Sequence, residues 1–404
     1  MDSSSLTNVY NQSCKELKQC YSLDIVTQKE GHMRLSNIEV KKQNRINVYR
    51  TVMANEKVSR QEIAALLSLS LPTVGQNIKE LIALGLVAES GELVSTGGRR
   101  ASSVSALPDS RIGIGLDITQ NHVSLAASNL KGEVLAHVRI PQKFANTNEY
   151  YQSAANLTHR FIAQQVKNPD KILGIGVSVP GIVSHDGKSL VRSHLLNIKE
   201  STEISLSDCL DYEVRLCNDA SAASMAELSV SPDLENMVYL SLSNSVGGAI
   251  ILNRALVEGN NLHSAEFGHA TLVPGGKMCY CGKKGHFDSY GSALSLSSYG
   301  DGRLETFFSK LEGKESLCTE IFRKYLDTLA IMINNIRAIF DCDIVLGGYV
   351  GSFLGPYLPE IMSRVEERDT FAEKATYLKT CRYKIEASAV GASLHFIDSF
   401  IQTI

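Results

Sequence analysis

The stretch "VSRQEIAALLSLSLPTVGQNIKELIALGLV", residues 58–87, predicts two short helices joined by a tight turn. Ser59 is placed to cap the first helix, and Glu62 three residues later completes a capping box. Pro72 suits the first turn of the second helix, and Gly85 follows its last apolar residues as a terminator. Two short helices around a tight turn are typical of a helix-turn-helix, in which the second helix is the reader.

The flanking segments extend this motif into a small domain. "NRINVYRTVMAN", residues 44–55, has apolar residues at the spacing of one helical face, which predicts a preceding helix. Two β-prone runs, 86–88 and 92–95, lie on either side of Ser90-Gly91, which we expect to form the turn of a small wing. The sequence therefore predicts a winged helix-turn-helix.

Charge supports a nucleic-acid partner for this domain. The whole chain has a formal net charge of −3, but residues 41–100 hold nine Lys/Arg against five Asp/Glu. Phosphate attraction needs a concentrated basic face and not a basic protein. The same features also fit a protein-interaction domain with a solvated helix face. The side chains expected to contact DNA, two of them arginines after a glycine pair, are Arg60, Thr73, Gln76, Asn77, Lys79, Arg99 and Arg100.

From residue 112 onward the pattern changes to an order of strand, strand, strand, helix, strand, which then recurs. The first copy is expected at 111–119, 122–130, 132–140, 149–166 and 171–184, and the second at 236–244, 247–253, 254–259, 318–340 and 342–348. A repeated order of this kind predicts two similar α/β lobes. A cleft between lobes is the default place for a small ligand.

Together these stretches resemble the ROK family of sugar-responsive repressors. The matching segments are "NRINVYRTV", "VSRQEIAALLSLSLPTV", "ELIALGLV", "TGGRR", "GIGVSVPGIV", "CNDASAASMAE", "AEFGH", "CYCGKKGH", "DIVLGG" and "AVGAS". The resemblance implies an α/β, two-lobed body of the actin and hexokinase type behind the winged helix-turn-helix, and a homodimer or homotetramer. We expect an N-terminal extension at 1–40, the DNA-binding domain at 41–105 and the ROK body at 106–404. Within the body we expect a first lobe at about 106–217 plus the C-terminal helix, and a second at about 218–390.

A cysteine-rich loop, "TLVPGGKMCYCGKKGHFDSYG" at residues 271–291, indicates a metal site. Cys279, Cys281 and His286, together with His269 before the loop, are four thiol or imidazole donors, which suit a closed tetrahedral zinc of structural type. The ROK resemblance implies a zinc held by one His and three Cys, so His286 takes the place of a cysteine. The alternative is a glycine-rich loop with two unligated thiols.

The resemblance also implies a sugar site. Its matching positions are Asn218, Asp219, Glu266, His269 and Asp288, the last of which is shorter by one methylene than the family's Glu. Carboxylates and an amide offer the acceptors and donors that vicinal hydroxyls need. Two structural alternatives remain open here: Asn218-Asp219 as a helix N-cap, and Glu266 as a solvated loop carboxylate.

Phosphoryl transfer is not expected, although the ROK family includes sugar kinases. Asp219 matches the base of these kinases, but residues 117–121 are Asp-Ile-Thr-Gln-Asn where the kinases have Asp-Ile-Gly-Gly-Thr. The family's glycines let backbone N–H groups approach the ATP phosphates, and side chains stand here instead. We therefore expect no enzyme, but a transcriptional regulator, a repressor, with an operator duplex and a sugar effector as partners.

Two alternative functions are retained: a sugar kinase with an appended head, and a DNA-binding protein whose body binds a protein partner. The N-terminal residues lack the basic start and apolar middle of a secretory signal, and no apolar run has membrane-spanning length. Nine cysteines without a signal peptide favour reduced thiols. We expect a cytoplasmic protein with no membrane partner.

Overall fold

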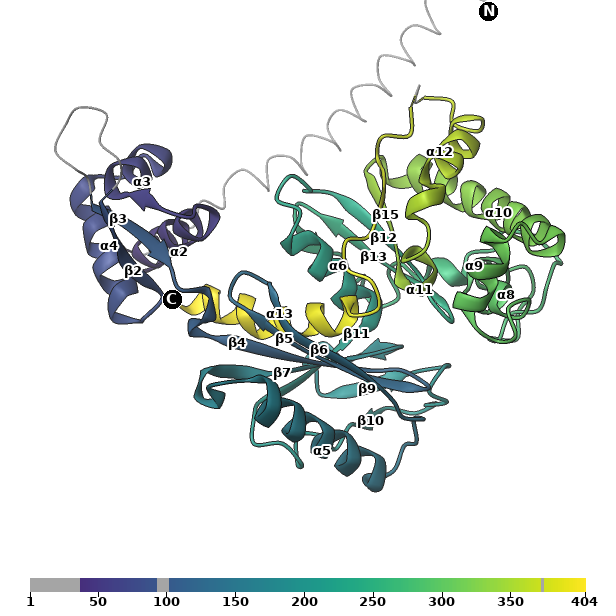
Figure 1. Cartoon of the computed structure of the whole chain (residues 1–404), viewed down its shortest axis with the longest axis horizontal. Coiled ribbons are helices and arrows are strands. Elements are labelled where there is room, and N and C mark those ends of the chain that lie inside the picture. The colour runs from purple at the N-terminus through teal and green to yellow at the C-terminus, as the bar shows by residue number, and fades with distance from the viewer. Residues whose placement is uncertain (1–36, 93–101, 372–373) are drawn as a thin grey trace, which may run out of the picture. The chain divides into compact units, whose positions relative to one another are not determined.

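The computed structural model describes residues 37–92, 102–371 and 374–404 (Figure 1). These residues form two compact units, a head made mainly of the residues up to Ala83 and of Glu89–Val104, and a body made mainly of Ser105–Thr403. No helix among the described residues is long and apolar enough to cross a membrane.

Among the residues that the structure describes, the head contains three helices and a small sheet in the order β1-β3-β2. The bounds of these elements are α2 (Asn37–Ala54), β1 (Val58–Ser59), α3 (Arg60–Leu67), α4 (Leu71–Ala83), β2 (Val87–Glu92) and β3 (Ser102–Ala106). Apolar residues of all three helices are fully buried, among them Tyr49, Ile63 and Ile78. The structure confirms the helix-turn-helix with its wing strands.

Local geometry at the helix ends follows the sequence prediction. The Ser59 side chain accepts a hydrogen bond from the Glu62 backbone N–H, and the Glu62 carboxylate accepts from the Ser59 N–H at 2.8 Å, so the capping box is present. Ser68, just after α3, takes a left-handed conformation with φ 53°. Gly85, just after α4, has φ 69°, a conformation that favours glycine at a helix terminus.

The predicted position of the wing turn is wrong. Ser90 and Gly91 lie inside β2, where the Ser103 hydroxyl of β3 donates to the Gly91 carbonyl at 2.9 Å. Gly91 has φ 85°, and a glycine with positive φ accommodates an irregularity within a strand as readily as a turn. The expected second run at 92–95 falls, beyond Glu92, outside the described residues, as do Arg99 and Arg100.

Two five-stranded sheets with the same topology form the body. The first has the order β11-β7-β4-β5-β6 and the second β14-β13-β12-β15-β16; in each, three strands form an antiparallel meander and two further strands pair in parallel. The bounds in the first are β4 (Ile112–Ile118), β5 (His122–Asn129), β6 (Val134–Pro141), β7 (Ile172–Val179) and β11 (Val214–Asn218). Those in the second are β12 (Met237–Leu242), β13 (Val246–Leu252), β14 (Ala255–Leu256), β15 (Asp343–Gly347) and β16 (Leu378–Thr380). The predicted pair of similar lobes is confirmed.

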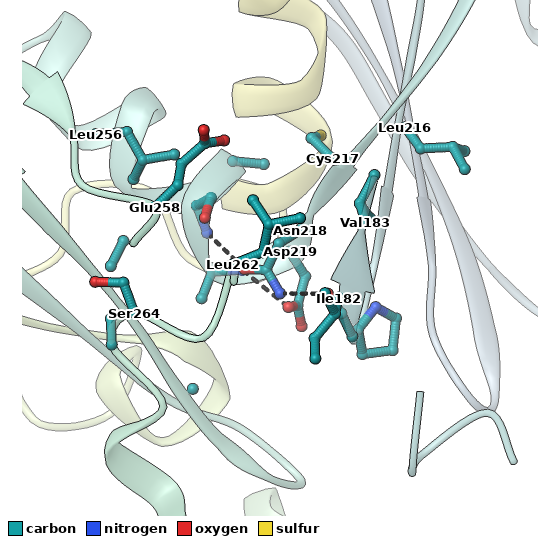
Figure 2. A pocket seen from close by; sticks show the side chains of 18 of the residues that line it. Ile182, Val183, Leu216, Cys217, Asn218, Asp219, Leu256, Glu258, Leu262 and Ser264 are labelled. Atoms are coloured by element: carbon teal, nitrogen blue, oxygen red, sulfur yellow. Dashed lines mark hydrogen bonds between the residues drawn. The ribbon is translucent and has the colours of Figure 1, made fainter. Parts of the chain in front are cut away.

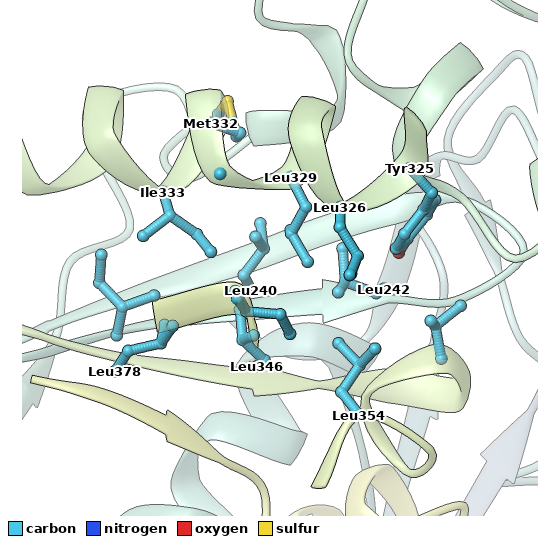
Figure 3. Packing of buried hydrophobic residues seen from close by; sticks show 14 of the residues in the cluster. Leu240, Leu242, Tyr325, Leu326, Leu329, Met332, Ile333, Leu346, Leu354 and Leu378 are labelled. Atoms are coloured by element: carbon cyan, nitrogen blue, oxygen red, sulfur yellow. The ribbon is translucent and has the colours of Figure 1, made fainter. Parts of the chain in front are cut away.

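Each lobe carries a long helix between its third and fourth strands: α5 (Asn148–Gln165) in the first and α10 (Ser316–Phe340) in the second. Figure 3 shows α10 placing Leu326, Leu329 and Ile333 against Leu240 and Leu346 of the sheet below it. The remaining elements are β8 (Ile182–Val183), β9 (Ser189–Arg192), β10 (Thr202–Glu203), α6 (Asp219–Ser229), α7 (Asp288–Gly291), α8 (Leu294–Ser297), α9 (Leu304–Glu312), α11 (Gly348–Gly351), α12 (Leu358–Glu366) and α13 (Ala387–Thr403).

The C-terminal helix α13 packs against the first sheet at backbone distance, alongside β4 and β5 (Figure 1). A Cβ atom on Gly115 would lie 1.7 Å from the Ala389 carbonyl oxygen, and one on Gly176 would lie 2.0 Å from the Ala392 carbonyl oxygen. A Cβ on Gly391 would similarly meet the Ala222 carbonyl of α6. Only glycine fits these contacts, so α13 and α6 are fixed against the sheet edge where β11 ends.

Candidate functional site

A cavity of about 1020 Å³ opens between segments of the two lobes of the body. Its wall includes β8 and β11 from the first lobe, the start of α6, and β14 with the following loop, 257–266, from the second lobe (Figure 2). The first-lobe wall lies at the carboxyl end of β11, a common position for ligands in α/β sheets. Of the five positions that the resemblance implies for a sugar site, Asn218, Asp219, Glu266 and His269 line the cavity.

Asn218 has both of its side-chain atoms engaged at the junction of β11 and α6. Its Oδ1 accepts from the Ser221 N–H at 2.9 Å, which makes it the N-cap of α6, and its Nδ2 donates to the Gly181 carbonyl at 3.0 Å. The N-cap alternative is therefore correct for Asn218. The cap fixes the next residue, Asp219, as the first residue of α6.

The carboxylate of Asp219, which lines the cavity, lies close enough to that of Asp117 for the two to influence each other. Burial and, secondly, the neighbouring charge of Asp117 together raise the pKa of Asp219 to about 7. Burial also raises the pKa of Asp117 to about 6, although Ser178 Oγ donates to its Oδ1 at 2.6 Å. Burial and a like charge both disfavour ionisation, so Asp219 is available near neutral pH as either a proton acceptor or a donor.

His269 links the cavity to the cysteine-rich loop. Its Nε2 lies 3.1 Å from the Tyr280 hydroxyl and 4.0 Å from a Glu266 carboxylate oxygen, while its Nδ1 faces the cysteines. Burial raises the pKa of Glu266, whose side chain is 44% exposed. Tyr280 lines the cavity and was missed in the sequence; its position between two candidate metal ligands was the available indication.

The four predicted metal ligands come together. The donor atoms of His269, Cys279, Cys281 and His286 all lie within 4.8 Å of one another. The two Nδ1 atoms are 3.4 Å apart, and Cys281 Sγ lies 3.2 Å from the Nδ1 of His286. A tetrahedral ion with bonds of about 2.0–2.3 Å needs donor separations of roughly 3.3–3.8 Å. The four donors gather at close to this spacing, so the cluster could hold a metal ion, with His286 as the fourth donor.

Asp288 is placed differently from the other predicted sugar ligands. Its side chain is buried, it does not line the cavity, and its Oδ2 accepts from the Val246 N–H at 2.7 Å. Burial raises the pKa of Asp288 to about 6. In this arrangement Asp288 holds the start of β13 against the loop that carries the candidate metal ligands.

The turn at residues 117–121, which replaces the glycine loop of the kinases, is closed by its own hydrogen bonds. Thr119 N–H donates to the His122 carbonyl at 2.9 Å, so β4 and β5 form a tight hairpin. The Gln120 and Asn121 carbonyls accept from the backbone of Phe144 and Gln142, both at 2.9 Å. The backbone here is committed to hairpin pairing and carries side chains at the positions where a phosphate cradle has glycines.

In the head, the predicted DNA-contacting residues on α4 divide into two groups. Gln76 and Lys79 are exposed, and Thr73 is half-buried at the start of the helix. Asn77 is only 7% exposed and donates to the Thr73 carbonyl at 2.8 Å, so its burial gives no support to the predicted DNA contact. Arg60, at the start of α3, pairs with Glu89 of β2 at 2.8 Å.

Comparisons with known proteins give the same two-part division. The family model described as ROK family matches residues 113–399, and the one described as winged helix-turn-helix DNA-binding matches residues 42–88. The chain is similar to the xylose repressor of Caldicellulosiruptor bescii, with 25% identity over 87% of this chain and 94% of that protein. It is also similar to the DNA-binding transcriptional dual regulator NagC of Escherichia coli (strain K12), with 27% identity over 90% of this chain and 94% of that protein.

Solved structures share the fold. A ROK family transcriptional regulator described as a homolog of the E. coli MLC protein superposes with a TM-score of 0.72 at 19% identity, covering 90% of this chain and 97% of that chain. A ROK family glucokinase from Streptomyces griseus, solved with glucose and AMPPNP, superposes with a TM-score of 0.59 at 18% identity, covering 70% of this chain and 98% of that chain. Since the ROK model spans more than half of the sequence, the chain belongs to the ROK family and carries a winged helix-turn-helix ahead of the ROK body.

Proposed function

We propose that this protein is a sequence-specific DNA-binding repressor whose affinity for its operator is controlled by a sugar or sugar derivative bound in the cavity of the body. The observation that carries the proposal is the combination in one chain of a winged helix-turn-helix with a ROK body whose cavity gathers Asn218, Asp219, Glu266 and His269. Relatives named xylose repressor and NagC support the same combination.

The cavity groups suit a polyhydroxylated ligand. Asp219 and Glu266 accept hydrogen bonds from hydroxyls, and Tyr280 and His269 supply further polar contacts at the same end. Because groups from both lobes contribute, a bound sugar favours the arrangement in which the lobes close on it. In a homodimer or homotetramer this closure alters the spacing of paired heads, which must match successive major grooves about 34 Å apart. The effector acts only to the extent that it binds one arrangement more tightly than the other.

The metal in this proposal is a structural zinc held by His269, Cys279, Cys281 and His286. When bound, zinc supplies a closed crosslink between the segment before the loop and the loop itself. Its role for the sugar site is positional, because His269 and Tyr280 both belong to the crosslinked segment and both line the cavity. In the same proposal, the protein acts on DNA in the cytoplasm. The side chains that contact the operator are Arg60, Thr73, Gln76, Lys79, Arg99 and Arg100.

The test is a ligand screen on the purified full chain, scored by binding to a fluorescent duplex from its own promoter region. The proposal expects tight binding to that duplex over a shuffled duplex, and a change in affinity with at least one pentose, hexose or amino sugar. Preference for no duplex would overturn the DNA-binding half, and indifference to every sugar would overturn the effector half. A duplex titration over a range of salt concentrations separates specific binding from phosphate attraction.

A second candidate, a sugar kinase, is favoured by one observation: Asp219 lies at the cavity with its pKa raised to about 7, a value suited to a general base. Against it stands the hairpin at residues 117–121, since phosphoryl transfer depends on positioned donors around the phosphates. A coupled assay with ATP over the same sugars distinguishes the two, and we expect no turnover. Sugar-dependent ADP release abolished by Asp219→Asn would establish the kinase instead.

A further inference from the structure

The polar side chains of α4 that the sequence offers for contacting DNA are already engaged within the head. Gln76 Nε2 donates to Glu80 Oε1 at 2.8 Å, and the other Glu80 oxygen accepts from Arg45 Nη1 of α2 at 2.5 Å. The hydrogen bonds from Gln76 and Arg45 lower the pKa of Glu80, so its carboxylate stays ionised and remains a strong acceptor. Reading an adenine takes both the oxygen and the nitrogen of a Gln amide, so Gln76 reads one only by exchanging its bond to Glu80.

Thr73 and Asn77 are engaged in a similar way. The Thr73 hydroxyl lies 2.8 Å from the Ser70 hydroxyl, which also accepts from the Thr73 N–H at 3.3 Å. Asn77 is buried, and its Nδ2 donates to the Thr73 carbonyl at 2.8 Å. A side chain bonded inside the head can still meet a phosphate of DNA, but phosphate contacts position the protein and carry no sequence information directly.

The first residue of α4 is apolar and exposed. Leu71 is 50% exposed, whereas the apolar residues that α4 packs into the head, Val74, Ile78 and Leu81, are fully buried. An exposed leucine is ordinary on a protein surface. Leu71 differs in its position, because the N-terminal residues of the second helix are those that contact base edges in a helix-turn-helix. Pro72, which follows it, is also exposed and has no N–H to donate.

Leu71 also lies on the side of α4 that carries Gly75. Residues four apart are neighbours on one face of a helix, so the aliphatic side chain lies beside a position without a side chain. A Cβ built at Gly75 meets no other part of the head within 4 Å, so the space beside Leu71 is open there. An open apolar position of this kind suits a methyl group that projects from a base edge. In the major groove, thymine is the base that presents one.

We propose that Leu71 is a specificity-determining residue of the operator interface, which recognises the 5-methyl group of thymine in the major groove. The inference rests on the proposed function, because it requires α4 to enter that groove of the operator. Thr73, Gln76 and Lys79 then position the helix on the DNA backbone. The aliphatic side chain at the helix start selects thymine over bases that present no methyl group at this place.

Matched duplexes test the methyl contact directly. In a duplex from the protein's own promoter region, each thymine is replaced singly by deoxyuridine, which lacks the 5-methyl group and keeps the hydrogen bonds of the base pair. The affinity of the full chain for each duplex is measured by fluorescence anisotropy. Burial of one methyl-sized group contributes ~0.8 kcal/mol, equivalent to about a fourfold change in affinity. We expect one or more thymines at which deoxyuridine weakens binding to this extent. A scan in which every deoxyuridine duplex binds as tightly as the parent duplex would overturn the inference.

The variant that assigns the contact is Leu71→Ala. Leu71 is half exposed at the end of its helix, so we expect the variant to fold with the Tm of the unmodified chain. Its affinity for the parent duplex should fall about fourfold, and deoxyuridine at the sensitive position should then cause no further loss. Leu71→Met, which keeps a long apolar side chain, should retain the sensitivity to deoxyuridine. Ile82→Ala, at an exposed aliphatic residue near the other end of α4, is the matched control and should change neither affinity nor sensitivity.

The outcomes separate this inference from the proposed function. Sensitivity to deoxyuridine that persists unchanged in Leu71→Ala would assign the methyl contact to another residue and overturn the inference, with DNA binding intact. Insensitivity to deoxyuridine, together with a loss of affinity for 7-deazaadenine duplexes that Gln76→Ala abolishes, would show that Gln76 reads an adenine instead. Equal binding to the promoter duplex and to a shuffled duplex would overturn the DNA-binding function itself.

Discussion

Gly75 gives a test in which stability and DNA binding move in opposite directions. It lies inside α4, the fifth of its 13 residues, beside the exposed Gln76. A Cβ atom built at Gly75 meets no atom within 4 Å, so nothing in the head requires a glycine here. A glycine in a helix interior costs about 1 kcal/mol relative to alanine. If α4 is the reading helix, this glycine permits the backbone to approach DNA closely.

The change is Gly75→Ala. We expect the head to gain about 1 kcal/mol, which corresponds to a rise in Tm of roughly 4–8 °C for a unit of 60–100 residues. We expect operator affinity to fall about tenfold, because an added methyl group displaces a contact of the size of one base-edge interaction, about 1–3 kcal/mol. Calorimetric unfolding and fluorescence anisotropy with an operator duplex measure the two effects on the same preparation.

Gly355→Ala is the matched control, because a Cβ there also meets nothing within 4 Å and the residue belongs to the body. Its operator affinity should equal that of the unmodified chain. A Gly75→Ala variant with a higher Tm and full operator affinity would refute the close approach of α4 to DNA. A lower Tm would refute the helical propensity argument itself.

Four further predictions concern charge, protonation and metal. Lys79→Ala should weaken binding to all duplexes alike and reduce the slope of log affinity against log salt concentration by about one. Asn77→Ala, at a buried residue, should lower the Tm of the head and leave that slope unchanged. Identical slopes for Lys79→Ala and the parent chain would show that Lys79 does not contact DNA. Asp219→Asn should keep operator binding but weaken the sugar response, as seen by anisotropy with and without the effector. The pKa of Asp219 is raised to about 7 from an ordinary 3.8, so between these pH values the folded state holds a proton that the unfolded state has released. The free energy of unfolding therefore falls as pH rises through this window. Asp219→Asn should flatten that fall and stabilise the protein most above pH 7, as measured by chemical denaturation of both proteins at pH 5 and pH 8. Cys279→Ser should eliminate stoichiometric zinc, measured by elemental analysis, and lower the Tm, whereas His286→Cys should retain the metal. An unchanged Tm after complete removal of zinc from the parent chain would contradict a structural role of the metal.

Much of the fold follows from local features of the chain. The capping box at Ser59 and Glu62, and the terminator Gly85, are short-range signals whose geometry depends on neighbouring residues. The wing turn was misplaced for the complementary reason. Ser90-Gly91 has the composition of a turn, and only pairing with β3, whose Ser103 bonds to Gly91, keeps it inside a strand.

The candidate site divides in the same way. The spacing of thiols and imidazoles predicted the four metal ligands, whose donor atoms the structure brings within 4.8 Å of one another, whereas the group at Asn218, Asp219, Glu266 and His269 was implied by the family resemblance. The pattern did not show that Asp288 turns away from the cavity to bond Val246, that Asn77 is buried, or that Tyr280 reaches His269. Each of these depends on the direction in which a side chain leaves a particular loop or helix.

By itself the sequence determined the order of most elements, the helix caps and the two repeated lobes, and it predicted the chemical character of the candidate metal site, since each depends on composition and short-range spacing. The tertiary structure decided which of those groups share a cavity and that burial and Asp117 raise the pKa of Asp219. These properties depend on distances between residues far apart in the chain. Such distances are set by the packing of the sheets and of α13, where close contacts at Gly115 and Gly176 admit no side chain.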